Sequence, residues 1–244
     1  MESNSQECSI KNLIEEFNFK SHSNYKLIIL LGLLGDFDSL EYAINLKNYS
    51  ENYPNKNLDF FAVAIGNEKG KEKFCKFTGF PEKNLKVVSD NKIHSNLKVS
   101  EGINIGLGGW INMLIMLSGI NSLRTIKEVI RGYTGDRNAK QIFSETDRFE
   151  ISKFIKFSGN SFKYAFGSGY LRPFELATLR LRNMIEIIKN WDDYILNIQY
   201  LPQRTASFIL NDKNEVIYKY FSKDVLGYSS KMDNPLRFLS EVCK

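Results

Sequence analysis

The chain has 244 residues, of which 43% are apolar, and its 33 basic and 28 acidic side chains leave a formal net charge of +5. This length and composition are those of an ordinary soluble globular protein with one generous core. No block of five like charges occurs, so a basic surface favours anionic partners but nucleic acid is not expected as one of them.

The cysteines and histidines point away from metal and disulfide chemistry. Cys8, Cys75 and Cys243 lie far apart, and none forms a Cys-x-x-Cys pair. A disulfide framework is therefore not expected, and a reducing compartment is. His22 and His94 have no second ligand at metal-binding spacing, so we expect no metal site, and nothing in the sequence indicates a cofactor.

Two segments bear on localisation. The first 17 residues carry acids early and lack the apolar centre of a secretory signal, so a cytoplasmic protein is expected. The segment from Ile103 to Leu123 has no charged residue and is long enough to cross a bilayer. It also contains Asn, Gly and Ser, and only 110–117 is densely apolar. We expect a buried helix and no transmembrane span, with peripheral membrane docking through 103–123 as the alternative.

The elements begin as an α/β unit. Residues 7–18 show helical spacing, and the unbroken apolar run KLIILLGLL at 26–34 predicts a strand covered on both faces. The next stretch, GDFDSLEYA at 35–43, puts two carboxylates at the turn. We expect Asp38 to be the N-cap, with Glu41 completing a capping box, before a helix of about fifteen residues.

A second unit of the same kind follows. The run LDFFAVAIG at 58–66 predicts a parallel strand, and 68–79 predicts a helix ending at a glycine. The segment 85–90 is a brief extension or edge strand. From about 94 to 170 the pattern changes to helices and glycine-containing loops, which we interpret as a helical insertion.

The last part of the chain closes the fold. We expect one long helix from Pro173 to about residue 197. The runs 206–212 and 214–222 predict an antiparallel hairpin, and 235–243 a final helix. The long helix should bury the face formed by Phe174, Ala177, Leu181, Met184, Ile188 and Trp191.

These elements define the expected architecture. Residues 1–24 form an N-terminal helix and extension, and residues 25–244 form one α/β domain with a central mixed sheet flanked by helices. Parallel strands first and an antiparallel hairpin last are the element order of the thioredoxin-like fold.

The amino-acid sequences of several segments resemble those of a known family. GDFDSLEYA looks like a strand-to-helix redox site, and FCKFTGFP at 74–81 is similar to the second helix and turn of the same proteins. RGYTGDRNAKQIF and GYLRPFELATLRLRNM look like the longer form found in photosynthetic lineages. From about residue 25 to 240 the chain thus resembles the peroxiredoxin-like proteins of the alkyl hydroperoxide reductase and thiol-specific antioxidant (AhpC/TSA) family, which implies a redox or antioxidant role.

The resemblance also shows what this chain lacks. Active relatives carry Cys-x-x-Cys, or a similar motif, before Glu-Tyr-Ala, and those two positions fall here on Asp36 and Ser39. Neither side chain forms a disulfide or a sulfenate. A carboxylate at Asp38 would occupy the amides that otherwise favour a thiolate, and Asp36 would raise the pKa of a nearby sulfur. Asp36 as a general acid or base has no partner acid, histidine or metal cluster in the sequence.

Two residues remain as catalytic candidates. Cys75 has Lys71 and Lys76 beside it, which would favour a thiolate if the sulfur were exposed, but a lone cysteine in an amphipathic helix is more typical of core packing. Arg204 looks like the arginine that steadies the thiolate and peroxide in relatives, although its spacing to Phe208 is one residue longer. Without a thiolate we expect it exposed or paired with a carboxylate.

Other arginines have simpler interpretations. RGYTGDR at 131–137 lacks the strand, glycine-rich loop and helix of a phosphate loop, so we expect Gly132 to end a helix and Gly135 to form a turn, with anion binding as the alternative. Arg180 and Arg182 fall off the apolar stripe of the long helix, where a solvated face is expected, with Arg182 paired to Glu186.

Three hypotheses follow. In the first, the chain is a peroxiredoxin-like protein whose thiol peroxidase site has been replaced and which acts as a binding or scaffolding module for an unidentified protein partner. In the second, it is an antioxidant oxidoreductase that uses Cys75, with Arg204 or an external thiol donor. In the third, it attaches to a membrane or a photosynthetic complex through 103–123.

Overall fold

The computed structural model describes residues 2–19, 21, 23–53, 57–120, 122–152, 155–163 and 167–243. Within these ranges the side chains of 2–8, 149–152, 155 and 157 are left out of the description. His22 and the side chain of Cys8, both considered above, therefore lie outside the described part.

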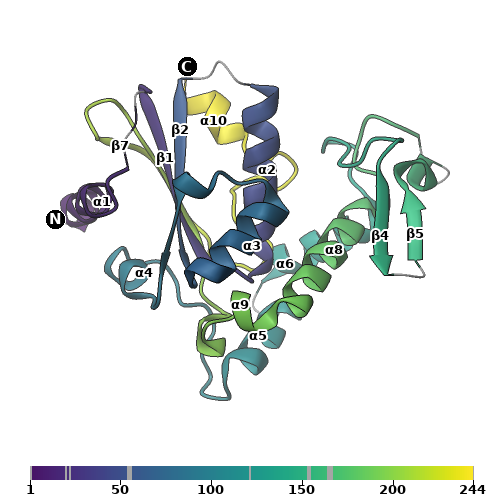
Figure 1. Cartoon of the computed structure of the whole chain (residues 1–244), viewed down its shortest axis with the longest axis horizontal. Coiled ribbons are helices and arrows are strands. Elements are labelled where there is room, and N and C mark those ends of the chain that lie inside the picture. The colour runs from purple at the N-terminus through teal and green to yellow at the C-terminus, as the bar shows by residue number, and fades with distance from the viewer. Residues whose placement is uncertain are drawn as a thin grey trace.

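A five-stranded mixed sheet forms the centre of the molecule (Figure 1). Its strands are β1 (Tyr25–Leu33), β2 (Leu58–Ile65), β3 (Leu85–Val88), β6 (Ala206–Leu210) and β7 (Val216–Phe221), in the order β3-β2-β1-β6-β7. β1, β2 and β3 pair in parallel, whereas β6 and β7 are antiparallel to their neighbours. The predicted α/β architecture and the predicted hairpin are confirmed.

Both faces of the sheet are covered, as the unbroken apolar runs indicate. Successive side chains of a strand point to opposite faces, and the odd-numbered Leu27 and Ile29 of β1 join the core under α2 (Phe37–Asn52) and α3 (Glu68–Thr78). The even-numbered Ile28 and Leu30 join a second core with α1 (Glu2–Glu16) and the loop after α4 (Lys92–Asn96). α10 (Arg237–Val242) packs on the first core.

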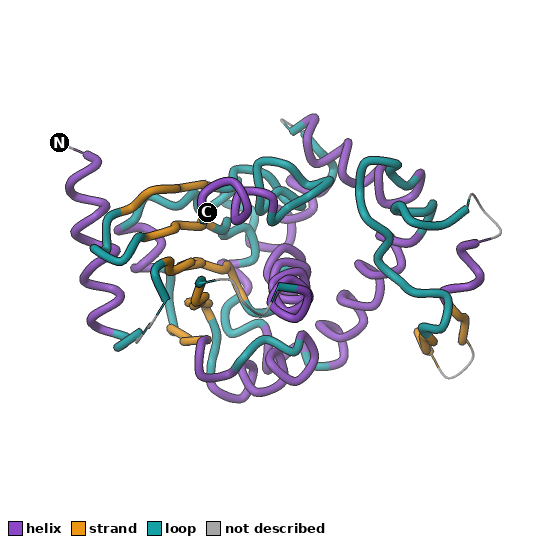
Figure 2. The backbone as a smooth tube through the Cα atoms, turned by 90° about the horizontal axis from the view of Figure 1, so that it is seen from above, coloured by secondary structure: helices purple, strands orange, loops and turns teal. Residues whose placement is uncertain are grey.

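The region expected to be a helical insertion contains two longer helices and a hairpin. α5 (Gly109–Leu117) and α6 (Leu123–Thr134) are followed by the antiparallel strands β4 (Arg148–Ser152) and β5 (Ile155–Ser158). Figures 1 and 2 show this hairpin apart from the central sheet, with α8 (Glu175–Lys189) leading back from it. The described residues also form short elements: α9 (Trp191–Tyr194) and the 3-10 turns Glu82–Asn84, Gly159–Phe162 and Ile198–Tyr200. The proposed division into an extension and a domain with an insertion stays a prediction.

The long helix differs from its prediction in length and in its buried face. It starts at Glu175 and ends at Lys189, and Asn190 separates it from α9, which begins at Trp191. The expected stripe is largely in solvent: Phe174 is 57% and Ile188 61% exposed. The side chains that it buries are instead Glu175, Leu176, Leu179, Asn183 and Ile187.

The uncharged segment 103–123 is only partly buried. α5 buries Met113 and Met116 but leaves Trp110 and Leu114, 48% and 58% exposed, in solvent. The expectation of a buried helix is therefore wrong for one face of α5. Among the described residues, no helix combines the length and apolar character that crossing a bilayer requires.

Candidate functional site

The turn after β1 brings its polar side chains inward. Asp36 is the N-cap of α2 by backbone geometry, but its side chain makes no capping hydrogen bond, so the prediction that Asp38 caps the helix is wrong. Asp38 lies in the first turn of α2 and is fully buried, as is Ser39. The chain can pack this tightly because Gly35 precedes it: a Cβ there would lie 2.6 Å from Cδ1 of Ile195.

A buried arginine lies between the two acids. Nη1 of Arg204 donates to Oδ2 of Asp38 at 3.1 Å, and Nη2 lies 3.9 Å from Oδ1 of Asp36. Nε donates to the carbonyl of Pro202 at 2.6 Å, and Nη2 donates to that of Leu201 at 3.2 Å. The guanidinium has no solvent-exposed surface. Arg204 is therefore the carboxylate-paired residue expected from the sequence, and it is buried as well.

The cluster holds two acids against one cation. Burial raises the pKa of Asp36, which the charge of Arg204 and the nearby amides of Asp38 and Phe37 oppose. Burial also raises the pKa of Asp38, helped by the charge of Asp36 and opposed by Arg204. Asp38 Oδ2 accepts from both Arg204 and the amide of Leu226, whereas no described residue makes a hydrogen bond of standard geometry to Asp36. Asp38 is therefore the carboxylate that pairs with Arg204, and the two neighbouring acids titrate together rather than independently.

A second buried network lies behind the turn. Nε of Arg180, from α8, donates to Oε2 of Glu41 at 2.9 Å, and Nη1 donates to the carbonyl of Glu128 at 2.9 Å. Oε2 of Glu128 also accepts a hydrogen bond from Nη2 of Arg131 at 2.6 Å. The expectation that Arg180 lies on a solvated face is wrong, because α6 packs against α8 and covers it. Glu41, expected to complete a capping box, serves this network instead.

Cys75 lies in a different part of the molecule. It is only 8% exposed and belongs to the core under α2 and α3. Burial raises the pKa of the Cys75 thiol to about 11, helped by the charge of Glu82 and opposed by Lys71. The guanidinium of Arg204 binds Asp38 and two backbone carbonyls, and none of its hydrogen bonds or ion pairs within the described residues goes to Cys75.

The comparisons with known proteins are consistent with this architecture. A family model described as AhpC/TSA antioxidant enzyme matches residues 45–224, the larger part of the chain. The chain belongs to the AhpC/TSA family. Searches of the curated proteins and of the solved structures returned no match. The family match contains Cys75 and Arg204 but begins after Asp36 and Ser39, so the assignment of the cysteine positions to these two residues stays a prediction.

In this AhpC/TSA protein the glycine-rich stretch 131–137 is a helix end. α6 continues through Gly132 to Thr134 and is ended by Gly135, whose φ is 77°, so the predicted stop at Gly132 is wrong by three residues. Arg131 is paired with Glu128 and lies 3.8 Å from Asp136. Its charge is balanced locally, which does not favour anion binding.

Two further residues behave differently from their predictions. The guanidinium of Arg182 lies over the ring of Phe77, with 5.1 Å between guanidinium carbon and ring centroid. Glu186, its expected partner, accepts hydrogen bonds from Asn190 and Tyr194.

Within the part of the chain that the structure describes, no three His, Cys, Asp or Glu side chains come close enough to hold a metal ion.

Several buried polar residues of this AhpC/TSA protein were missed from the sequence. Arg172 and Glu175 form a fully buried ion pair at 3.0 Å, and Glu175 also accepts from the amides of Ile142 and Phe143. His94 is fully buried against the carbonyl of Leu31 at 2.6 Å. The spacing of three residues between Arg172 and Glu175 was a usable signal. The pairing of Arg180 with Glu41, 139 residues apart, had no local signal.

Proposed function

We propose that this AhpC/TSA protein does not reduce peroxides at the turn after β1 and acts as a binding or scaffolding module. The observation that carries the proposal is that the hydrogen-bond donors of Arg204 are already used within the protein. In the relatives that this chain resembles, the matching arginine steadies a thiolate and the peroxide. Here the guanidinium is fully buried and its donors go to Asp38 and to two backbone carbonyls.

The surroundings of the turn support the same proposal. Asp36, Asp38 and Ser39 are almost completely shielded from solvent, so a peroxide has no route to them in this conformation. A carboxylate accepts the hydrogen bonds that would otherwise stabilise a thiolate at the start of α2. The turn is best explained as a structural cluster in which Arg204 holds two buried acids.

The alternative of an oxidoreductase acting through Cys75 is less well supported. With a pKa of about 11, only about one thiol in several thousand is ionised at pH 7.5, and the thiolate is the reactive form. The donors of Arg204 go to Asp38 and to the carbonyls of Pro202 and Leu201. Both considerations favour core packing for Cys75.

A peroxide-consumption assay tests the proposal. We expect the wild-type protein with dithiothreitol to consume hydrogen peroxide no faster than Cys75→Ser does, and neither to exceed the buffer rate. Consumption by the wild type that Cys75→Ser abolishes would contradict the proposal and favour the oxidoreductase. Consumption by both proteins would contradict it too, because the residual activity would come from elsewhere in the chain.

A second candidate role, docking on a lipid surface through 103–123, is supported by the exposed face of α5. Leu107 and Leu114 are exposed, and Trp110 stacks on Trp191 with 5.0 Å between ring centroids while remaining half in solvent. We expect the protein to float with phosphatidylcholine vesicles and Leu114→Glu to prevent this. Ile217→Glu, at an exposed position of β7, is the control. Equal behaviour of the two variants would exclude this role, as would failure of the wild type to float.

A further inference from the structure

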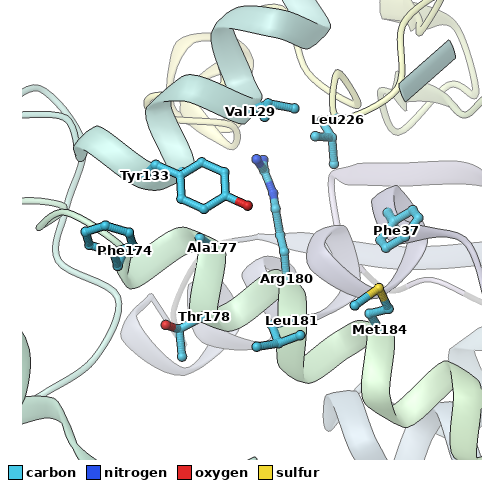
Figure 3. Close-up of a pocket in the computed structure, with 11 residues that line it drawn as sticks. Phe37, Val129, Tyr133, Phe174, Ala177, Thr178, Arg180, Leu181, Met184 and Leu226 are labelled. Atoms are coloured by element: carbon cyan, nitrogen blue, oxygen red, sulfur yellow. The ribbon is translucent and has the colours of Figure 1, made fainter. Parts of the chain in front are cut away.

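A cavity of about 360 Å³ lies between the start of α2 and the helices α6 and α8 (Figure 3). This volume is within the range of small-molecule sites, roughly 300–1,000 Å³. Most of its lining is apolar and includes Phe37, Val129, Phe174, Leu181 and Met184. The cavity explains why Phe174, Leu181 and Met184 of the predicted buried stripe are open: these side chains face a hollow and not the core.

The cavity adjoins the buried carboxylate cluster. Phe37, on its wall, stands in the chain between Asp36 and Asp38. Leu226, on the same wall, donates its amide to Asp38. A molecule in the cavity would therefore lie against the elements that form the turn, without touching the acids themselves.

Phe174 gives an independent indication of a ligand. Its φ is 64°, a left-handed conformation that bulky residues rarely adopt. Core burial does not compensate for this strain, since the ring is largely exposed and meets Tyr133 edge to face, with 6.0 Å between the centroids. Strained residues of this kind cluster at ligand sites, and here the strain places an aromatic ring at the cavity.

The charges around the cavity select an uncharged occupant. Among the described residues that line it, Arg180 is the one that carries a charge, and its donors already go to Glu41 and Glu128. Arg131 balances the second acid, so the network of two arginines and two glutamates is neutral. A ligand carboxylate would have to displace one of these acids. The hydroxyl of Tyr133, directed toward Arg180 in Figure 3, makes no hydrogen bond within the described residues and is free to bind a ligand oxygen.

We propose that this cavity binds a neutral, mainly apolar small molecule with one hydrogen-bonding oxygen, such as an aliphatic alcohol or ester. The proposal rests on the proposed role as a binding module and names the ligand class and the site. α6, inside the expected insertion, and α8, directly after it, build most of the pocket. Ligand binding would thus be a property of this region rather than of the replaced redox turn.

Fluorescence of the neutral dye Nile red, displaced by competitors, tests the proposal on the full chain. We expect saturable binding of one dye per chain. We also expect 1-octanol to displace the dye at a concentration at least about tenfold lower than octanoate at pH 8, because no described residue that lines the cavity offers the carboxylate an unpaired cation. Equal potency of the two competitors, or better displacement by octanoate, would overturn the neutral-ligand assignment.

Two variants of α8 form a matched pair. Leu181 lines the cavity, whereas Ile188 is exposed on the same helix and does not. Leu181→Asp should weaken dye binding at least about tenfold and Ile188→Asp less than about twofold, because a charge inside the cavity opposes an apolar ligand. Equal weakening would mean that the dye adheres to the exposed helix face, which overturns the proposal.

Sedimentation velocity of the wild type tests whether a second copy of the chain occupies the cavity instead of a small molecule. A dimer that Leu181→Asp dissociates, together with absent dye binding, would overturn the proposal in favour of self-association. Absence of dye binding by a monomer would overturn it as well. Peroxide consumption is read separately, so failure of the ligand proposal does not imply that the turn is catalytic, and active turnover would contradict the proposed function whatever the dye does.

Discussion

Replacing the buried cation, Arg204→Met, probes the carboxylate cluster most sharply. The substitution removes the group that lies 3.1 Å from Asp38 and 3.9 Å from Asp36, and all three side chains are buried. Breaking a buried ion pair on one side costs about 3–5 kcal/mol, because the remaining charge has no partner. We therefore expect the free energy of unfolding at pH 7 to fall by about 4 kcal/mol.

The loss should depend on pH with a defined sign. Burial raises the pKa values of both carboxyl groups, so the folded state holds protons that the unfolded state releases, and stability falls as pH rises above about 4. Without Arg204 these pKa values rise further. At pH 4 the acids are protonated, and the cost should shrink to about 1–2 kcal/mol, that of the hydrogen bonds to Pro202 and Leu201.

Urea unfolding followed by circular dichroism measures both quantities. Arg237→Met is the matched control, because Arg237 is half exposed and pairs with Glu241 on the surface, so its loss should cost less than about 1 kcal/mol. If Arg204→Met does not fold, the triple variant with Asp36→Asn and Asp38→Asn should recover it, since no buried charge remains. A cost at pH 7 equal to that of Arg237→Met, or a cost unchanged at pH 4, would refute the reasoning.

Three further predictions concern single residues. Burial lowers the pKa of His94 to about 4, so its contribution is retained above pH 6.5 and up to about 3 kcal/mol is lost as pH falls toward 4. His94→Gln should flatten the stability profile measured by urea unfolding in that window, and an unchanged slope would contradict this. An aromatic disulfide reagent at pH 8, followed by peptide mapping, should label Cys75 at least about a hundredfold more slowly in the folded chain than in urea, and equal rates would contradict its burial. Phe174→Gly should exceed Phe174→Ala in unfolding free energy by about 1 kcal/mol because φ is positive, whereas a more stable alanine variant would argue against backbone strain.

The sheet was predictable because its signals are local. The apolar runs that became β1 and β2 sit between turn residues, and a short turn separates the two runs that became β6 and β7. Gly79 ends α3 with a φ of 74°, as its place before Pro81 indicated. Each of these features depends on residues within a few positions of one another.

The site was less predictable because its contacts are distant in sequence. Asp36 and Asp38 both fit the start of a helix, and only the approach of Arg204, 166 residues after Asp38, decides which carboxylate receives its hydrogen bond. Likewise, α8 has apolar residues on two faces, and periodicity alone does not choose between them. The hydrogen bonds that buried Glu175 accepts from Arg172 fix which face of α8 is turned inward.

Trapping of sulfenates tests the central claim, that this AhpC/TSA protein performs no thiol peroxidase chemistry at the turn after β1 or at Cys75. The native wild-type protein is exposed to hydrogen peroxide with dimedone and analysed by peptide mass spectrometry, with a urea-unfolded sample as positive control for trapping. We predict no peroxide-dependent adduct on Cys75 in the native protein. A stoichiometric native adduct that forms with peroxide and disappears in Cys75→Ser would contradict the account.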